Sequence, residues 1–114
     1  MAFSRGEIRL ANFNPSRGTE PGKVRPCLVI QGDLLNEVEH PSTTVIPLTT
    51  QLTPGAAPLR LKIQARDKLN EDSDLMIDQL RTIDNRRLTG DLLTRLSPVE
   101  MLRVSEYLKI LLEL

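Results

Sequence analysis

The chain has 114 residues, and its 15 Lys and Arg residues balance 15 Asp and Glu residues, so the formal net charge is zero. This balance argues against the broad positive field of a nonspecific duplex-DNA binder, and three aromatic residues are too few for a stacking platform along single strands. A single cysteine, Cys27, excludes an internal disulfide, and its apolar neighbours predict a buried, inert thiol. The length suits one domain over residues 1–114.

Membrane, metal and cofactor sites are not expected from the sequence. No apolar run follows the first charged residues and none approaches a membrane span, which predicts a cytoplasmic protein without membrane contact. One His and one Cys cannot supply the usual metal ligands, so we expect neither a metal nor a cofactor. His40 is the obvious side chain for acid–base chemistry. It precedes Pro41 in a loop, however, and we interpret it as an exposed bystander.

Residues 24–30 are expected to form the central strand. From residue 27 onward no polar residue interrupts this stretch, which is typical of a strand buried on both faces. Pro26 has no N–H for a sheet ladder and is expected at the strand mouth, where it holds Arg25 extended at a rim. Period-two alternation over residues 8–13 predicts the preceding strand, and the turn-rich segment 14–22 predicts a mobile loop between the two.

The remaining strands are predicted from β-branched residues and period-two alternation. They cover residues 43–48, 59–63, 74–83 and 88–96. Pro47 is expected at a sheet edge or a bulge, and Gly90 is expected to make the last strand irregular. One helical turn is predicted at residues 33–36.

The C-terminal segment carries a strong helix signal. Ser97 can cap, Pro98 fits the first turn, and Glu100 completes a capping box. Apolar residues then recur at helical spacing, and we interpret them as core or as a subunit interface: Met101, Val104, Leu108 and Leu111. Six short strands followed by one helix predict a mainly β (α+β) fold, a small and strongly bent barrel-like sheet closed by a helix.

Polar side chains at strand ends are the candidates for chemistry. Arg25 stands at one strand entrance, Thr49 and Thr50 at another strand's exit, and Asp78 within a third strand. Together they would place a cation, hydroxyl donors and a carboxylate around a phosphate, which fits metal-free cleavage of RNA by its own 2′-hydroxyl. The alternative is an exposed Arg25 paired with a nearby acid. Spacing alone does not decide between the two interpretations.

Several short motifs, in the same order, resemble the MazF/PemK family of toxin endoribonucleases. They are residues 5–8, 18–20, 22–30, 45–50 and 78–84, which read RGEI, GTE, GKVRPCLVI, VIPLTT and DQLRTID. The resemblance implies an SH3-like, CcdB/PemK-type β-barrel with a C-terminal helix. It also implies a homodimeric toxin of a type II toxin–antitoxin system. Such a toxin would cut single-stranded mRNA at a short sequence without metal, leaving a 2′,3′-cyclic phosphate and a 5′-hydroxyl.

The resemblance also implies roles for particular residues. The family's two catalytic residues fall on Arg25 and Thr49, and Asp78 falls where some members use an acid in proton transfer. Residues expected to contact RNA are Thr19, Glu20, Pro26, Thr50 and Gln79. Thr19 stands where some relatives have His, so a histidine-assisted mechanism is not available. A guanidinium is a poor base, and Asp78, Glu20 or a water molecule remain as alternatives for that role.

The family likeness implies a protein partner as well. Members are commonly inhibited by a MazE-like antitoxin whose flexible, acidic tail occupies the RNA groove. Residues 1–25 carry five basic and two acidic residues, a local excess that would accept either tail carboxylates or RNA phosphates. Two alternatives are a non-enzymatic gyrase poison on the same barrel and a barrel that only binds RNA or antitoxin. The related gyrase inhibitors depend on a tryptophan, and this chain has none.

Overall fold

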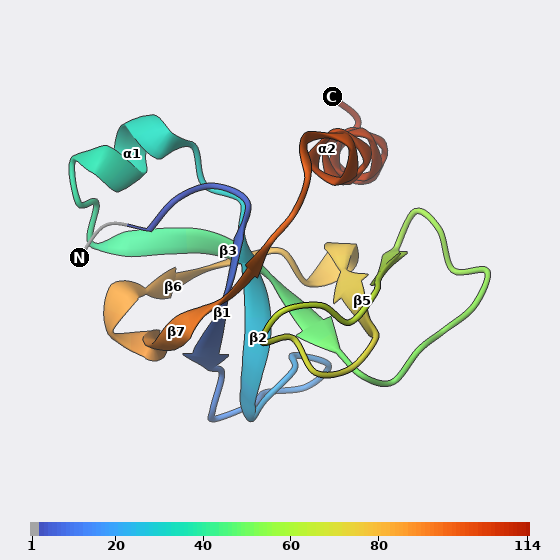
Figure 1. Ribbon diagram of the computed structural model, residues 1–114, viewed down its shortest axis with the longest axis horizontal. Coiled ribbons are helices and arrows are strands. Elements are labelled where there is room, and N and C mark those ends of the chain that lie inside the picture. Colours follow the sequence, from blue (N-terminus) through green and yellow to red (C-terminus); the bar gives the residue numbers. More distant parts are fainter. Residues whose placement is uncertain (1–2) are drawn as a thin grey trace.

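The computed structural model describes residues 3–114, which form a strongly bent sheet with helices at one end (Figure 1). The elements are β1 (Glu7–Asn12), β2 (Val24–Val29), α1 (Asp33–Glu37), β3 (Ser42–Thr49), β4 (Arg60–Ile63), β5 (Ser73–Met76), η1 (Ile77–Gln79), β6 (Arg81–Asp84), η2 (Asn85–Arg87), β7 (Leu88–Arg95) and α2 (Pro98–Leu112). Met1 and Ala2 lie outside the described residues. They belong to the N-terminal stretch in which the lack of an apolar run predicted a cytoplasmic protein. None of the helices described is long and apolar enough to cross a membrane.

The strands pair antiparallel in the order β4-β5-β3-β2-β1-β7, and β6 pairs with a second stretch of β3. The helices α1 and α2 stand at one end of the molecule, and the loop between β1 and β2 lies at the opposite end (Figure 1). The predicted mainly β fold with a C-terminal helix is confirmed. The helical turn predicted near residue 33 is present as α1.

The strand β2 is buried on both faces, as predicted. Leu28 belongs to one apolar cluster, and its neighbours Cys27 and Val29 belong to another, because successive side chains of a strand point to opposite faces. The first cluster also includes Ile8, Ile46, Leu48, Leu75, Met101 and Val104. The second includes Phe3, Ala11, Phe13, Val45, Ile83 and Leu88. Burial raises the pKa of the Cys27 thiol to about 12, which agrees with an inert thiol.

The prediction of one strand over residues 74–83 is wrong. Leu48 of β3 faces Leu75, so an unbroken strand would place Asp78 opposite Val45. Arg81 stands opposite Val45 instead. The register of β6 on β3 is therefore shifted by three residues from that of β5. The three residues of the 3-10 turn η1 account for this shift: they separate β5 from β6 and carry Asp78 out of the sheet. The described part of the chain therefore has seven strands rather than six.

Pro47 lies within the central strand β3 and is buried, so the prediction of an edge or bulge is wrong. The main-chain oxygen of Thr44 accepts the Ile30 N–H at 3.1 Å, so the even-numbered residues of β3 turn their hydrogen-bonding groups toward β2. Pro47 faces the other side, where pairing with β6 ends at Val45 and pairing with β5 begins at Leu48. Its missing N–H therefore leaves no ladder bond unmade.

Two other local predictions are confirmed. Register shifts make the pairing of β7 with β1 irregular, and a Cβ at Gly90 would lie 2.7 Å from Leu10 Cβ. Only glycine allows the two strands to approach this closely. The capping box of α2 is also present: Ser97 Oγ accepts the Glu100 N–H at 3.2 Å, and the Glu100 carboxylate accepts the Ser97 N–H at 2.8 Å.

Candidate active site

Arg25 and Thr49 lie at neighbouring strand ends on one face of the sheet. The last residue pair in the register of β2 and β3 is Cys27 with Pro47, and continuing that register by two residues sets Arg25 opposite Thr49. Pro26 has no N–H to extend the ladder, so the two strands part here. Both side chains are half-buried. A guanidinium and a hydroxyl are thus presented at the rim, rather than on opposite sides of the barrel or within its core.

The guanidinium of Arg25 is anchored by one of its three nitrogens. Its Nε donates to the main-chain oxygen of Gly22 at 2.7 Å. Within residues 3–114, Arg25 forms no ion pair with an acid, which argues against the alternative of a simple surface ion pair. Nη1 and Nη2 keep four N–H donors in one plane, the arrangement that binds two oxygens of a phosphate.

The hydroxyl of Thr49 is oriented by the residue two positions further on. Thr49 Oγ1 accepts the Gln51 N–H at 3.2 Å. This hydrogen bond uses an acceptor site of the oxygen, so the hydroxyl proton stays available for donation to a ligand. Thr49 can therefore serve as a hydrogen-bond donor to a phosphate oxygen without losing the contact that orients it.

Asp78 and Gln79 lie on η1, outside the sheet. Asp78 Oδ1 accepts from Arg60 Nη1 at 2.5 Å, an ion pair that fixes the carboxylate. The side chain of Asp78 remains about one-third exposed, and Gln79 is half-buried. The turn η1 contacts α2 and β4 as well as β3. The structure thus brings Arg25 and Thr49 to adjacent strand ends and directs the Asp78 carboxylate to Arg60.

Thr19 and Glu20 are exposed in the loop between β1 and β2. Among the described contacts, none fixes their side chains to the sheet. The start of the loop, however, is held by a residue from another part of the chain. Arg87 Nη1 donates to the main-chain oxygens of Asn12 and Asn14, at 3.0 and 2.6 Å. Arg87 is not part of any of the sequence motifs, and only its contacts in three dimensions reveal this role.

Pro26 and Thr50 line a cavity of 260 Å³. Pro26 alternates with Arg25 along β2, so the cavity opens on the other face of the strand from the Arg25 side chain. The remaining lining residues are Leu10, Lys68, Leu69, Asn70, Glu71, Ser73 and Leu93. Two of the residues predicted to contact RNA, Pro26 and Thr50, therefore lie at this cavity, on the other side of the rim from the guanidinium.

Asp74 was not singled out from the sequence, yet the register places it directly beside Thr49 on β5. Its carboxylate is 4% exposed, and its Oδ2 accepts the Thr53 N–H at 2.8 Å. The available signal in the sequence was an acid at the start of an apolar run, Leu75, Met76 and Ile77, because a carboxylate in a buried strand needs a hydrogen-bond partner. The row across the strands runs from Arg25 through Thr49 to Asp74.

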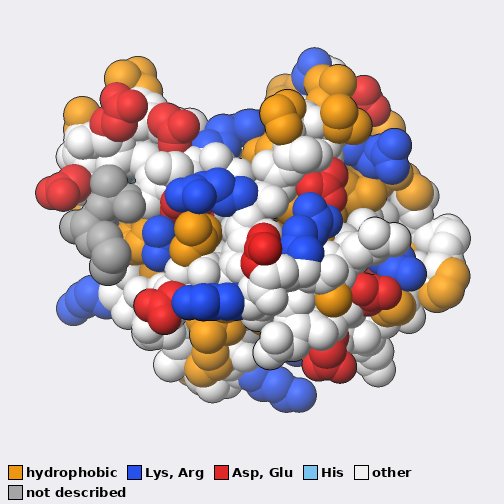
Figure 2. Space-filling view, viewed as in Figure 1, with side chains coloured by type: hydrophobic (Ala, Val, Ile, Leu, Met, Phe, Trp, Pro, Cys, Tyr) orange, Lys and Arg blue, Asp and Glu red, His pale blue; other side chains and the backbone are white. Residues whose placement is uncertain are grey.

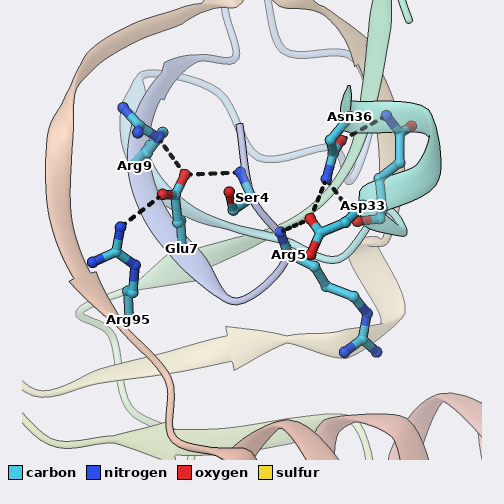
Figure 3. A network of polar contacts seen from close by, with 8 residues as sticks. Ser4, Arg5, Glu7, Arg9, Asp33, Asn36 and Arg95 are labelled. Atoms are coloured by element: carbon cyan, nitrogen blue, oxygen red, sulfur yellow. Dashed lines mark hydrogen bonds and ion pairs between the residues drawn. The ribbon is translucent and has the colours of Figure 1, made fainter. Parts of the chain in front are cut away.

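Glu7 of the RGEI motif is buried and holds neighbouring segments together (Figure 3). The buried carboxylate accepts from the Ser4 N–H at 3.0 Å, from Arg9 Nε at 2.9 Å and from Arg95 Nη2 at 3.2 Å. Burial acts to raise the pKa of Glu7, but the hydrogen bonds from Arg9 and Ser4 outweigh it and hold the pKa below its usual value. The Arg9 guanidinium also lies 5.3 Å from the Phe3 ring centroid. These contacts bind the N-terminal segment to β1 and β7.

Charge is mixed over the surface. On the face seen in Figure 2, Lys and Arg side chains alternate with Asp and Glu side chains and do not gather into one broad patch. This distribution agrees with the zero net charge of the sequence. Affinity for a polyanion must then come from a local arrangement, such as the rim formed by Arg25 and Thr49, rather than from a general field.

Comparison with known proteins points to one family. A family model described as "PemK-like, MazF-like toxin of type II toxin-antitoxin system" matches residues 4–112. The chain is 39% identical over 115 residues to endoribonuclease EndoA of Bacillus subtilis (strain 168), and the match covers 100% of this chain and 97% of the relative. It is 36% identical over 111 residues to endoribonuclease MazF of Staphylococcus epidermidis, with 96% and 91% covered.

Solved structures share the fold. MazF from Deinococcus radiodurans superposes with a TM-score of 0.83 at 23% identity, covering 100% of this chain and 99% of that one. The Mycobacterium tuberculosis toxin MazF-mt6 gives a TM-score of 0.76 at 22% identity, with 95% and 97% covered. Fold and sequence together define a small toxin with a CcdB/PemK-like sheet and a C-terminal helix. The chain belongs to the PemK/MazF family of type II toxin–antitoxin systems.

Proposed function

We propose that this chain is the toxin of a type II toxin–antitoxin pair and acts in the cytoplasm as a sequence-specific endoribonuclease on single-stranded mRNA. The observation that carries the proposal is the placement of Arg25 and Thr49 at adjacent strand ends, with both side chains half-buried at the rim. It is supported by relatives of 39% and 36% identity that are named endoribonucleases.

In the proposed reaction the RNA supplies its own nucleophile. A base removes the proton of a 2′-hydroxyl, O2′ bonds to the adjacent phosphorus, and the bond from that phosphorus to the next O5′ breaks. The leaving O5′ takes up a proton, so the products are a 2′,3′-cyclic phosphate and a 5′-hydroxyl. Arg25 and the Thr49 hydroxyl stabilise the negative charge on the other phosphate oxygens, the role that a metal ion would otherwise fill.

The proton acceptor is a carboxylate in this proposal, because a guanidinium stays protonated at neutral pH. Asp78 is the first candidate. Its side chain is partly exposed, and its Oδ1 forms the ion pair with Arg60, which leaves Oδ2 to accept the proton. Glu20, on the exposed loop, is the second. Asp78→Asn and Glu20→Gln separate them: the variant that flattens the acidic limb of the rate profile against pH identifies the base.

Contacts to the bases are proposed on both sides of the rim. Thr19 and Glu20 would approach the RNA from the β1–β2 loop, and Gln79 would approach from η1. Pro26 and Thr50 would contact a nucleotide at the 260 Å³ cavity. Unpaired bases are recognised by hydrogen bonds at their edges and by packing against apolar side chains, and this cavity offers both.

Two protein partners belong to the proposal. The first is a second copy of the chain, and the exposed apolar side chains of α2, Val99, Leu102 and Ile110, support a homodimer. The second is an antitoxin with an acidic, flexible tail that competes with RNA for Arg25. Complexes of MazE with MazF from Deinococcus radiodurans, which share this fold with a TM-score of 0.75, support that partner.

The test is to map cut sites. We expect the purified chain, incubated with a long RNA, to give discrete new 5′ ends within one short sequence, each with a free hydroxyl. Ligation that requires a 5′-phosphate should fail on these ends until a kinase adds one. An RNA that stays intact at protein concentrations that arrest growth would overturn the proposal, and gyrase trapped on DNA in its place would favour the non-enzymatic alternative.

A further inference from the structure

The segment that follows Thr49 is held to the sheet by very little. Residues 50–55 lie outside the strands and most of their side chains are exposed. Residues 52–57 line a cavity of 320 Å³, so packing adds little support on that side. Among the hydrogen bonds of the described residues, the one from the Thr53 N–H to Asp74 Oδ2 is the one that links residues 50–55 to another strand.

Asp74 is built into the sheet and does not move with this segment. It faces Thr49 on one side and Lys62 on the other in the register of β3, β5 and β4. Its carboxylate is 4% exposed. A buried carboxylate that receives a main-chain N–H is a strong and directional attachment, because a hydrogen bond to an ionised acceptor is shorter and stronger than one between neutral groups.

The attachment closes a short turn around the Thr49 hydroxyl. Thr49 is fixed at one end by pairing with Asp74, and Thr53 is fixed at the other end by the same residue. Between them, the Gln51 N–H donates to Thr49 Oγ1 at 3.2 Å. The direction of the hydroxyl therefore depends on where Gln51 lies, and the position of Gln51 depends on the clamp at Thr53.

We infer that Asp74 is a positioning residue for the reaction: it clamps the 49–53 turn so that the Thr49 hydroxyl points at the scissile phosphate. This inference rests on the proposed endoribonuclease function. Asp74 is 4% exposed and its Oδ2 is engaged by the Thr53 N–H, so we assign it a role through Thr49 and not that of the base. A donor displaced by about 1 Å can lose on the order of 10²-fold in rate, which is the effect expected when the clamp is released.

The experiment compares two substitutions of Asp74. Asp74→Asn keeps an oxygen that can accept the Thr53 N–H, whereas Asp74→Ala removes the acceptor. On an RNA oligonucleotide spanning the mapped cut site, we expect Asp74→Ala to lower kcat by about 10- to 100-fold with little change in KM. Asp74→Asn should retain most of the parental kcat and the parental pH profile.

Asp72→Ala is the matched control. Asp72 Oδ1 accepts the Ala65 N–H at 2.8 Å, the same kind of bond two residues away, but on a loop that does not touch Thr49. It should cleave at the parental rate. If Asp74→Ala also cleaves at that rate, the inference is wrong. If Asp74→Asn loses as much as Asp74→Ala and also loses the acidic limb of the pH profile, Asp74 transfers a proton and is not a positioning residue.

A second measurement needs neither a substitution nor cleavage. The Thr53 amide should exchange with deuterium far more slowly than Leu52 or Gly55, because it donates to a buried carboxylate. Exchange of Thr53 at the rate of its neighbours would overturn the clamp whatever the variants do. A protected Thr53 in a chain that cuts no RNA would instead leave the clamp standing and overturn the proposed function.

Discussion

Arg87 donates a hydrogen bond from Nη1 to the main-chain oxygen of Asn14 at 2.6 Å, joining η2, just before β7, to the start of the β1–β2 loop. The same nitrogen reaches the oxygen of Asn12 at 3.0 Å. Asn14 in turn accepts the Lys23 N–H through Oδ1 at 2.8 Å, which closes the base of the loop. The loop that carries Thr19 and Glu20 is therefore held by a residue more than 60 positions further along the chain.

We predict that Arg87→Gln weakens cleavage by loosening this loop. Without these hydrogen bonds the loop that carries Thr19 and Glu20 is no longer held in place, so kcat/KM on the mapped oligonucleotide should fall by about 10-fold or more. The fold should persist, because the contacts lie at the surface end of the sheet. Far-UV circular dichroism should therefore be unchanged while the kinetics change.

Arg86→Gln is the control for Arg87→Gln. Arg86 is the adjacent residue and its side chain is 91% exposed, and among the described residues its hydrogen bonds and ion pair are with Asp84 alone. It should cleave as the parental protein does. Equal losses in the two variants would indicate a general effect of positive charge on RNA affinity, and the loop explanation would then be wrong. A salt titration distinguishes the two, since a general effect weakens as ionic strength rises.

Most of the fold could be predicted because local patterns agree with the final packing. The run around Leu28 gave a strand buried on both faces, and Ser97 with Glu100 gave the start of α2. The failures are non-local. Nothing in the order of residues 74–83 indicates that β3 pairs with two different segments, and that shared pairing is what forces η1 out of the sheet. Pro47 was misplaced for the same reason.

The candidate site was predictable only in part. Arg25 and Thr49 could be named from strand-end positions and from the family likeness, and the register of β2 and β3 brings them together. Asp78 was expected in the same strand environment, but the looped-out turn η1 gives it Arg60 as a partner. Asp74 and Arg87 escaped notice because their roles depend on tertiary hydrogen bonds, which leave no periodic signal in the sequence.

A second prediction concerns the two donors at the rim. Arg25→Ala should lower kcat by about 10²-fold or more, because it removes a donor to the charge that develops in the transition state. Arg25→Lys should recover only a small part, since an ammonium cannot make the planar two-point contact. Thr49→Val should lower kcat by a similar factor, whereas Thr49→Ser, which keeps the hydroxyl, should retain much of it.

Thr89→Val is the control for Thr49→Val. Thr89 lies exposed on β7, so the same change of hydroxyl to methyl there should leave kcat unchanged. Binding of a non-cleavable RNA carrying a 2′-deoxy nucleotide at the cut site should be measured for every variant. If Thr49→Val loses affinity and keeps kcat, the hydroxyl holds the substrate and does not stabilise the transition state.

A third prediction is that cleavage needs no divalent metal ion. Arg25 and Thr49 supply the positive and donor groups in the proposed reaction, so EDTA should leave the initial rate within error of the untreated protein. Added magnesium should slow the reaction slightly, because it screens RNA phosphates that Arg25 must contact. Activity that disappears with EDTA and returns with magnesium would contradict the mechanism.

The last prediction concerns acid stability and the N-terminus of α2. Arg66 donates from Nη1 and Nη2 to the two Glu100 oxygens, at 2.8 and 2.6 Å. Hydrogen bonding from Arg66 is the main cause that holds the pKa of Glu100 at about 2, against an ordinary value of 4.5. The folded state therefore binds this proton less tightly than the unfolded state. The stabilisation is complete above pH 4.5 and is lost as the pH falls toward 2.

Glu100→Gln keeps an oxygen that can accept the Ser97 N–H of the capping box and removes the charge. At pH 7 the variant should be less stable by about 1–2 kcal/mol, a figure reduced for the partial exposure of the pair. The difference should shrink between pH 4.5 and pH 2, and urea unfolding at several pH values measures it. Glu106→Gln, at an exposed position of the same helix, is the control. A stability gap for Glu100→Gln that stays constant across this range would contradict the assignment of the loss to the ion pair with Arg66.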